Sequence, residues 1–320
     1  MSTFLRSKII LLVTIGLWAL TASPPLKAEE SGAGHYVPGG LATLIDLPPT
    51  QPGWVVQPLF LHYEGEASRS GAFPIAGVVT AGLEAKSDVL VFGAIYTFEP
   101  KVLGAYFSVG AYLPYMWMEV SADLSTPGVS RCRTDSTNGV SDITLIPAML
   151  AWKSGSWQYN ALAQVYAPTG SFEVGRLANP GLNYWTFDPA IGVTYNNEKS
   201  GFSFSVLSGI TINTENEDTN YKSGSVLHVE ASVQQHFKHG DGLLGIGANG
   251  FIYEQITDDS GAGAVLGAFR GRTAGIGPVV SYIRPIGKTI LVLELRWLPE
   301  LYAKRRLQGD YLWLKAALDF

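Results

Sequence analysis

The chain has 320 residues, of which 15% are charged, and its formal net charge is −5 at pH 7. An acidic balance gives no basic footprint for nucleic acid, and the charged fraction is well below the ~25% of ordinary soluble domains. The 36 glycines, 15 tyrosines, 14 phenylalanines and 8 tryptophans are instead typical of a transmembrane β-barrel, with a secreted soluble β-protein as the alternative.

The first 28 residues predict a secretory signal peptide. Arg6 and Lys8 give a positive start, and residues 9–20 form an almost unbroken apolar run that is short for a membrane span. Cleavage after Ala28 would leave a mature chain of about residues 29–320, in which no later stretch is long and apolar enough for a transmembrane helix.

Residues 29–52 precede the first predicted strand and are rich in Gly and Pro. They predict either a periplasmic tail or a plug that folds up into the lumen of a barrel, and the apolar residues within them favour the plug because they need burial. A plug would place His35, Tyr36 and Asp46 in the lumen.

Residues 53–320 predict a closed antiparallel transmembrane barrel of about twelve strands. A strand tilted across a membrane needs ~9–11 residues, and most of the strand-like runs are that long. The twelve runs are 54–64, 86–98, 102–119, 140–153, 156–167, 183–196, 201–212, 224–238, 242–256, 271–284, 288–299 and 309–320. Fourteen strands remain open if residues 29–52 or 65–85 contribute.

Side chains alternate along these runs with the period of a strand, which places one set toward lipid and the other toward the lumen. In residues 225–238, for example, Val229 and Phe237 share a face, whereas His228 and Glu230 share the opposite face. Charged groups are tolerated in a polar lumen but not against lipid. The predicted lumen-lining residues are His228, Glu230, Gln234, Glu294, Arg296 and Lys315.

Short and long connections alternate along the chain. Short turns such as Ser154-Gly155 lie between alternate pairs of strands, and the other connections are mostly over ten residues. Outer-membrane barrels have short periplasmic turns and long outside loops, so this pattern predicts that fold in a Gram-negative outer membrane. An even strand count puts both chain ends at the periplasmic side. The C-terminal Phe320, behind alternating apolar residues, is similar to the signal that the outer-membrane assembly machinery recognises.

Catalytic and metal chemistry find little support. The single cysteine, Cys132, can form no intramolecular disulfide or cysteine-based zinc site, and "SRCRTD" around it reads as a polar loop. The five histidines are not spaced as in known outer-membrane hydrolases, so we expect neither a catalytic residue nor a metal or cofactor. The basic run "AKRR" (303–306) is a candidate contact for lipopolysaccharide phosphates.

Seven segments, spread from about residue 34 to the C-terminus, resemble a known family. They are "GHYVPGG" (34–40), "GVSDITLIPAMLAW" (139–152), "YAPTGSF" (166–172), "NPGLNYWTFDPAIGVTY" (179–195), "YEQITDDSGAGAVLG" (253–267), "GIGPVVSY" (275–282) and "RLQGDYLWLKAALDF" (306–320). Together they are similar to the outer-membrane family associated with the meta-pathway of phenol degradation. The resemblance implies a transporter-like barrel in a Gram-negative bacterium, found near genes of aromatic degradation.

Together these observations predict a channel for the passive passage of small hydrophobic or aromatic molecules. Its partners would be outer-membrane lipid, lipopolysaccharide, the assembly machinery and a small solute. A non-conducting barrel with a structural or surface-binding role is the first alternative, and an outer-membrane hydrolase is the second. An open lumen favours the channel, a filled lumen favours the structural role, and Ser or Asp clustered with His favours the enzyme.

Overall fold

The computed structural model describes residues 26–27, 34–126, 129–267 and 270–320. Most of the predicted signal peptide, including the site after Ala28, therefore lies outside the described residues. Within the described residues, no helix is long and apolar enough to span a membrane.

The described residues form fourteen strands. They are β1 (Leu26–Lys27), β2 (Gly53–Ile75), β3 (Val78–Thr97), β4 (Tyr106–Thr126), β5 (Val129–Val140), β6 (Ile143–Ser154), β7 (Trp157–Ala167), β8 (Thr186–Asn197), β9 (Phe202–Asn213), β10 (Val226–His239), β11 (Gly242–Gln255), β12 (Arg272–Ile286), β13 (Thr289–Lys304) and β14 (Gln308–Asp319). Except for the two-residue β1, which is parallel to β2, neighbouring strands pair antiparallel.

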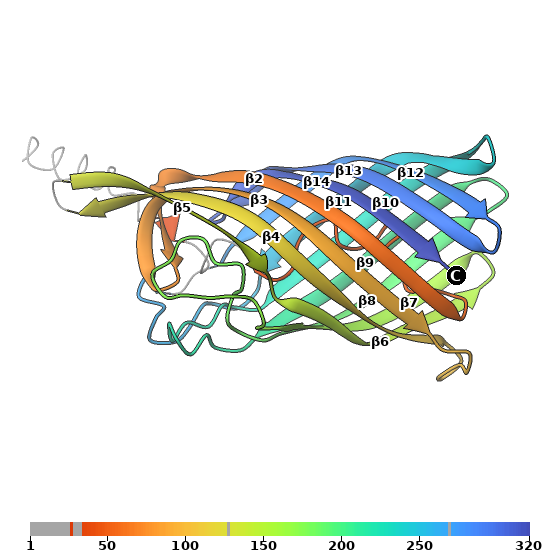
Figure 1. Ribbon diagram of the computed structural model, residues 1–320, viewed down its shortest axis with the longest axis horizontal. Helices are drawn as coiled ribbons and strands as arrows, with labels where there is room; N and C mark the ends of the chain where they lie inside the picture. Colours follow the sequence, from red (N-terminus) through yellow and green to blue (C-terminus); the bar gives the residue numbers. More distant parts are fainter. Residues whose placement is uncertain (1–25, 28–33, 127–128, 268–269) are drawn as a thin grey trace, which may run out of the picture.

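The sheet closes on itself into a barrel with twelve strand positions around its circumference (Figure 1). Pairing of β14 with β2, for example Leu314 with Phe60, joins the last barrel strand to the first. Both β5 and β6 pair with β4, so they are two halves of one barrel strand that is interrupted at Ser141 and Asp142. Among the described residues, each strand of the membrane-crossing wall is paired on both sides, and the all-β prediction with twelve strands is confirmed.

Two predicted outer loops are extended hairpins instead. Strands β2 and β3 continue far past the membrane-spanning runs and meet at Ala76 and Gly77, both with positive φ. Strands β4 and β5 do the same, so Cys132 lies exposed in β5, opposite Asp123, and not in a loop. The predicted long connection between β13 and β14 also shrinks, to residues 305–307, because β13 runs to Lys304. Outside the membrane a ladder needs no apolar face, so these polar segments carry no apolar alternation.

The outer wall of the barrel is apolar and its rims are aromatic. At the end where Gly53 adjoins Phe320, ring pairs such as Trp54–Tyr96 and Trp157–Tyr195 form a girdle. Aromatic girdles mark the two interfaces of a membrane barrel. The same end carries the short turns, so we assign it to the periplasm (Figure 1, where the C-terminus is marked).

The lipid face predicts a strong penalty for charge at mid-strand. Leu314 is 55% exposed in the middle of β14, and its neighbour Lys315 points inward and is buried. Leu314→Arg is expected to cost ~2–4 kcal/mol of unfolding free energy because the guanidinium would sit in hydrocarbon. Unfolding by guanidinium chloride in lipid vesicles, followed by tryptophan fluorescence, measures this change in unfolding free energy. Leu103→Arg is the matched control, since Leu103 is 83% exposed in the periplasmic turn between β3 and β4. Equal destabilisation by both substitutions would contradict the placement of the bilayer.

Candidate channel lumen and the segment inside it

The N-terminal segment, residues 34–52, runs through the inside of the barrel. Near its outer end, His35 contacts Thr186, the first residue of β8, and at its inner end Gln51 contacts Asp319 at the periplasmic rim. Tyr36, Leu41 and Ile45 of the segment join a buried cluster with residues of the barrel wall. The segment therefore enters from the outer side and descends to β2. Gly34 and the described strand β1, which pairs with Gly71 and Ala72 of the outer extension of β2, are thus not at the periplasmic rim, contrary to the prediction for the N-terminal end.

The lumen has two chemically different halves. Most inward side chains of strands β8–β14 are polar, with exceptions such as Tyr253, Leu298 and Trp313, and strands β2–β7 turn mostly apolar side chains inward. The polar half includes Asp188, Ser205, His228, Glu230, Asn249, Glu294, Arg296 and Lys315. The apolar half includes Leu59, Leu61, Val89, Val91, Met116, Met118, Ile146, Met149 and Leu162.

Two buried cations in the polar half hold the segment. Arg296 donates to the carbonyl of Gly39 at 2.7 Å and to Thr43 Oγ1 at 2.6 Å. Its guanidinium also pairs with Asp46 at 3.0 Å and with Glu294. Lys315 Nζ lies 2.6 Å from Asp46 Oδ1 and 2.7 Å from the same Gly39 carbonyl. Because buried charges are costly unless they are paired and hydrogen-bonded, these contacts fix the segment in one place.

Gly39 allows this close approach. Its φ is +85°, and a Cβ there would come within 2.5 Å of the Trp313 indole nitrogen. The indole N–H itself donates to the carbonyl of Pro38 at 3.0 Å. A side chain at Gly39 would therefore push the segment away from both cations.

Glu230 is the third anchor of the segment. Its carboxylate accepts hydrogen bonds from Tyr36 Oη at 2.8 Å, from Gly39 N at 3.0 Å and from Leu41 N at 3.3 Å. The ring of Tyr36 stacks on that of His228, with 3.9 Å between the ring centroids. His228 Nε2 in turn lies 2.8 Å from Oδ1 of the buried Asp188.

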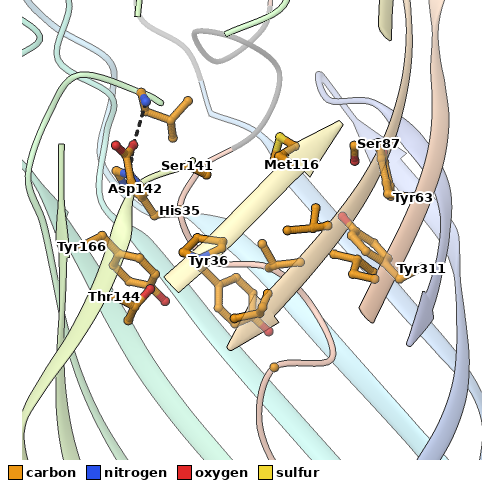
Figure 2. A pocket seen from close by; sticks show the side chains of 18 of the residues that line it. His35, Tyr36, Tyr63, Ser87, Met116, Ser141, Asp142, Thr144, Tyr166 and Tyr311 are labelled. Atoms are coloured by element: carbon orange, nitrogen blue, oxygen red, sulfur yellow. Dashed lines mark hydrogen bonds and ion pairs between the residues drawn. The ribbon is translucent and has the colours of Figure 1, made fainter. Parts of the chain in front are cut away.

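A separate contact fixes the outer end of the segment. The Asp142 carboxylate, at the break between β5 and β6, lies 2.9 Å from His35 Nε2. It also accepts hydrogen bonds from the backbone N–H groups of Gly170 at 2.8 Å and Leu182 at 2.7 Å, both in the outer loop 168–185. Figure 2 shows Asp142 beside His35. The His35 ring stacks on Tyr166, with 5.0 Å between the ring centroids.

The six predicted lumen residues all point inward, and all are buried. Five contact the segment, its anchors or each other, whereas Gln234 accepts a hydrogen bond from Ser281 on a neighbouring strand. Only Lys315 among them borders the cavity described next. Of the basic run 303–306, Arg306 turns inward and lies 3.7 Å from the ring centroid of Tyr253. Among the described residues, no group of three or more His, Cys, Asp or Glu side chains is placed to hold a metal ion.

A cavity of about 330 Å³ lies between the segment and the apolar half of the wall (Figure 2). It extends from mid-barrel residues such as Leu59 to the outer layer at Leu177 and Leu307. His35, Tyr36 and Leu41 of the segment border it from the other side. A volume of this size and an apolar wall match the sites that hold small organic molecules. The sequence prediction missed this wall because it assigned the apolar side chains of each strand to the lipid.

Comparisons with known proteins agree with this architecture. The family model described as "Putative MetA-pathway of phenol degradation" matches residues 68–316. The crystal structure of an outer membrane channel from Pseudomonas putida F1 superposes with a TM-score of 0.62 at 15% identity, covering 89% of this chain and 100% of that one. The β domain of the Bordetella autotransporter BrkA gives a TM-score of 0.48 at 10% identity, over 84% of this chain and 100% of that one. No curated protein matches the chain significantly by sequence. At 15% identity the likeness to the Pseudomonas putida channel shows the fold, which is that of an outer-membrane barrel.

Proposed function

We propose a channel function for this chain, which belongs to the family described as "Putative MetA-pathway of phenol degradation" and is an outer-membrane β-barrel. Small hydrophobic or aromatic molecules would cross the outer membrane through it by passive diffusion. One observation carries the proposal: the barrel encloses a cavity of about 330 Å³ whose wall is mainly apolar. Apolar molecules gain free energy on entering such a space from water.

In this proposal the N-terminal segment is a plug that must move. Below the cavity, Gln57 of β2 donates to the carbonyl of Ile45 at 2.7 Å, and Gln158 of β7 donates to that of Pro48 at 2.9 Å. These contacts tie the segment across the lumen toward the periplasmic end. A solute could reach the periplasm only after part of the segment shifts from the apolar half, while the charged anchors hold it against the polar half.

The surroundings of His35 argue against a hydrolase triad. His35 lies between Asp142 and Thr186, which resembles the order of a hydrolase triad, with 2.7 Å from His35 Nδ1 to Thr186 Oγ1. However, Thr186 is fully buried and donates its hydroxyl proton to Asn213 Oδ1 at 2.7 Å. Asn213 cannot reverse this bond, because its amide nitrogen donates to the carbonyls of Ser223 and Gly224. The hydroxyl therefore has no proton for His35 to accept, as a nucleophile would need.

The remaining partners belong to the same proposal. Lipid would surround the apolar outer wall, and lipopolysaccharide would contact the outer hairpins. Phe320, whose backbone pairs with Trp54 at the rim, would present the recognition signal to the assembly machinery.

Single-channel conductance in a planar bilayer tests the proposal. We expect the refolded mature chain to be silent, because the segment fills the polar half and crosses below the cavity. A chain lacking residues 29–52 should give discrete conductance steps. Steps in the full chain would contradict the plug, and silence in both would contradict an aqueous channel.

A further inference from the structure

Three polar side chains on one wall of the cavity make no hydrogen bonds to the protein. Thr144 of β6 pairs directly with Tyr166 of β7, and Gln164 lies two residues along on the same inward face. Figure 2 shows Thr144 and Tyr166 next to each other on the wall opposite Tyr63 and Tyr311. Among the described residues, none of the side-chain polar atoms of Thr144, Gln164 and Tyr166 has a hydrogen-bond partner.

This wall differs from the other buried polar sites of the barrel. Polar groups in protein interiors are nearly always hydrogen-bonded. The polar half of the lumen has exceptions, such as Asp188 Oδ2 and Ser232 Oγ, but these atoms are sealed from any ligand, whereas the polar atoms of this wall open onto the cavity. Gln164 is only 9% exposed, yet its amide faces the cavity without a protein partner. The natural partner of such a group is a molecule inside the cavity.

The rest of the cavity provides an apolar surface for the body of that molecule. Met116 and Met118 of β4 and Met149 of β6 border it, together with leucine, valine and isoleucine side chains of β2, β3, β6 and β7. Methionine is flexible and polarisable, so it adapts to rings of different shape and packs well against them.

We propose that the cavity selects neutral aromatic-sized molecules that carry one hydrogen-bonding oxygen, such as an aryl alcohol, a phenol or an aryl ketone. The oxygen would bind to Thr144, Gln164 and Tyr166, and the hydrocarbon body would lie against the methionines. The inference rests on the proposed channel function and names its substrate class. A hydroxyl and an amide can both donate and accept, so the wall accepts alcohols and ketones alike.

The charge distribution favours a neutral molecule. Lys315 borders the cavity, but it is already bonded to Asp46 and to the Gly39 carbonyl. Asp142 is likewise bonded to His35 and to two backbone N–H groups. Arg306 also borders the cavity, and its guanidinium already lies over the ring of Tyr253. A carboxylate would therefore lose its water without gaining Lys315 or Arg306 as a free partner, and the negative charge of Asp142 would repel it.

Calorimetric titration of the full chain in lipid nanodiscs tests this, with empty nanodiscs as the blank for partitioning. The probes are naphthalene, 2-naphthol and 2-naphthoate, which share one ring system. The wild type is expected to bind 2-naphthol about five- to tenfold more tightly than naphthalene, as one retained hydrogen bond predicts, and 2-naphthoate least.

Matched variants locate the selectivity. Thr144→Val with Tyr166→Phe should reduce the preference for 2-naphthol to under about twofold and leave naphthalene affinity unchanged, because shape is kept while the hydroxyls are removed. Gln164→Leu tests the third group in the same way. Tyr166→Phe alone keeps the ring that stacks on His35, so it serves if the double variant folds poorly. Tyr159→Phe is the control, since Tyr159 lies on β7 but faces outward, is 51% exposed and does not border the cavity, so removal of its hydroxyl should leave the preference intact.

The outcomes separate the two proposals. Equal wild-type affinity for naphthalene and 2-naphthol, or tightest binding of 2-naphthoate, overturns the selectivity but leaves a hydrophobic channel standing. Absence of saturable binding for all three probes overturns the hydrophobic channel itself.

Discussion

Replacing Arg296 with methionine is expected to release the N-terminal segment from the barrel wall. The guanidinium is fully buried and contacts Gly39, Thr43 and Asp46 of the segment, as well as Glu294 of its own strand. Its removal leaves the carboxylates of Asp46, Glu294 and Glu230 close together with Lys315 as the one remaining cation of the cluster. Breaking a buried ion pair by removing one partner typically costs ~3–5 kcal/mol, because the partner charge stays buried and unpaired.

Two measurements would detect the release of the segment. Amide hydrogen exchange of residues 34–46 should become faster by about a hundredfold or more, since every ~1.4 kcal/mol changes the open population tenfold. The same variant should show conductance steps that the wild-type chain lacks.

Arg284→Met is the matched control. Arg284 lies on β12 and pairs with Asp241 at 3.2 Å, but its side chain is 47% exposed and that of Asp241 is 82% exposed. Exposed ion pairs contribute ~0–1 kcal/mol, so exchange and conductance should stay close to wild type. Unchanged exchange in Arg296→Met would mean that the apolar contacts of Tyr36, Leu41 and Ile45 hold the segment without the charges.

The strands facing lipid could be predicted from the sequence because lipid imposes a strict period of two. β10 shows this plainly, since Val229, Val233 and Phe237 face outward while His228, Glu230 and Gln234 face inward. The outer extensions of β4 and β5 escaped prediction for the opposite reason. Water meets both faces there, so Ser, Thr and Asp residues can form the ladder and leave no apolar signal.

The interior of the barrel was less predictable. Alternation gives the direction of a side chain but not its neighbour, so the charged residues could be placed inward without showing that residues 34–46 cover them. The apolar half left a weak signal. In β3, Val89 and Val91 border the cavity, while the intervening Leu90 points outward, so both faces are apolar. A strand buried on both sides reads as a continuous apolar run, and "VLVFGAI" (89–95) is such a run.

The division of the lumen suggests how anchoring and passage can coexist in one narrow barrel. The charged anchors lie on β10, β13 and β14, and the apolar cavity lies against β2–β7. A segment fixed by charge on one side can yield on the other, where apolar contacts, the side chains of Gln57 and Gln158 and, at the outer end, the contacts of His35 oppose it. Movement would then open a path along the apolar wall without exposing the buried charges to hydrocarbon solute.

Asp142 is placed to couple this movement to the outer loop. One carboxylate bonds to His35 of the segment and to Gly170 and Leu182 at the two ends of loop 168–185. Asp142→Ala would remove three partners at once, and each hydrogen bond to a charged group is worth ~1.5–3 kcal/mol. We therefore expect faster hydrogen exchange in both places, at residues 34–38 and at residues 168–185. Binding of aromatic probes should weaken as well, because Leu177 and Leu182 of this loop border the cavity.

Asp135→Ala separates the coupling from a general loosening of the loop. Asp135 lies on β5 and accepts the backbone N–H of Leu177 at 3.2 Å, but it has no contact with the N-terminal segment among the described residues. Its loss should speed exchange in residues 168–185 and leave residues 34–38 protected. If Asp142→Ala likewise changes the loop alone, the loop and the segment open independently, and the outer end of the segment is held by the stacking of His35 on Tyr166.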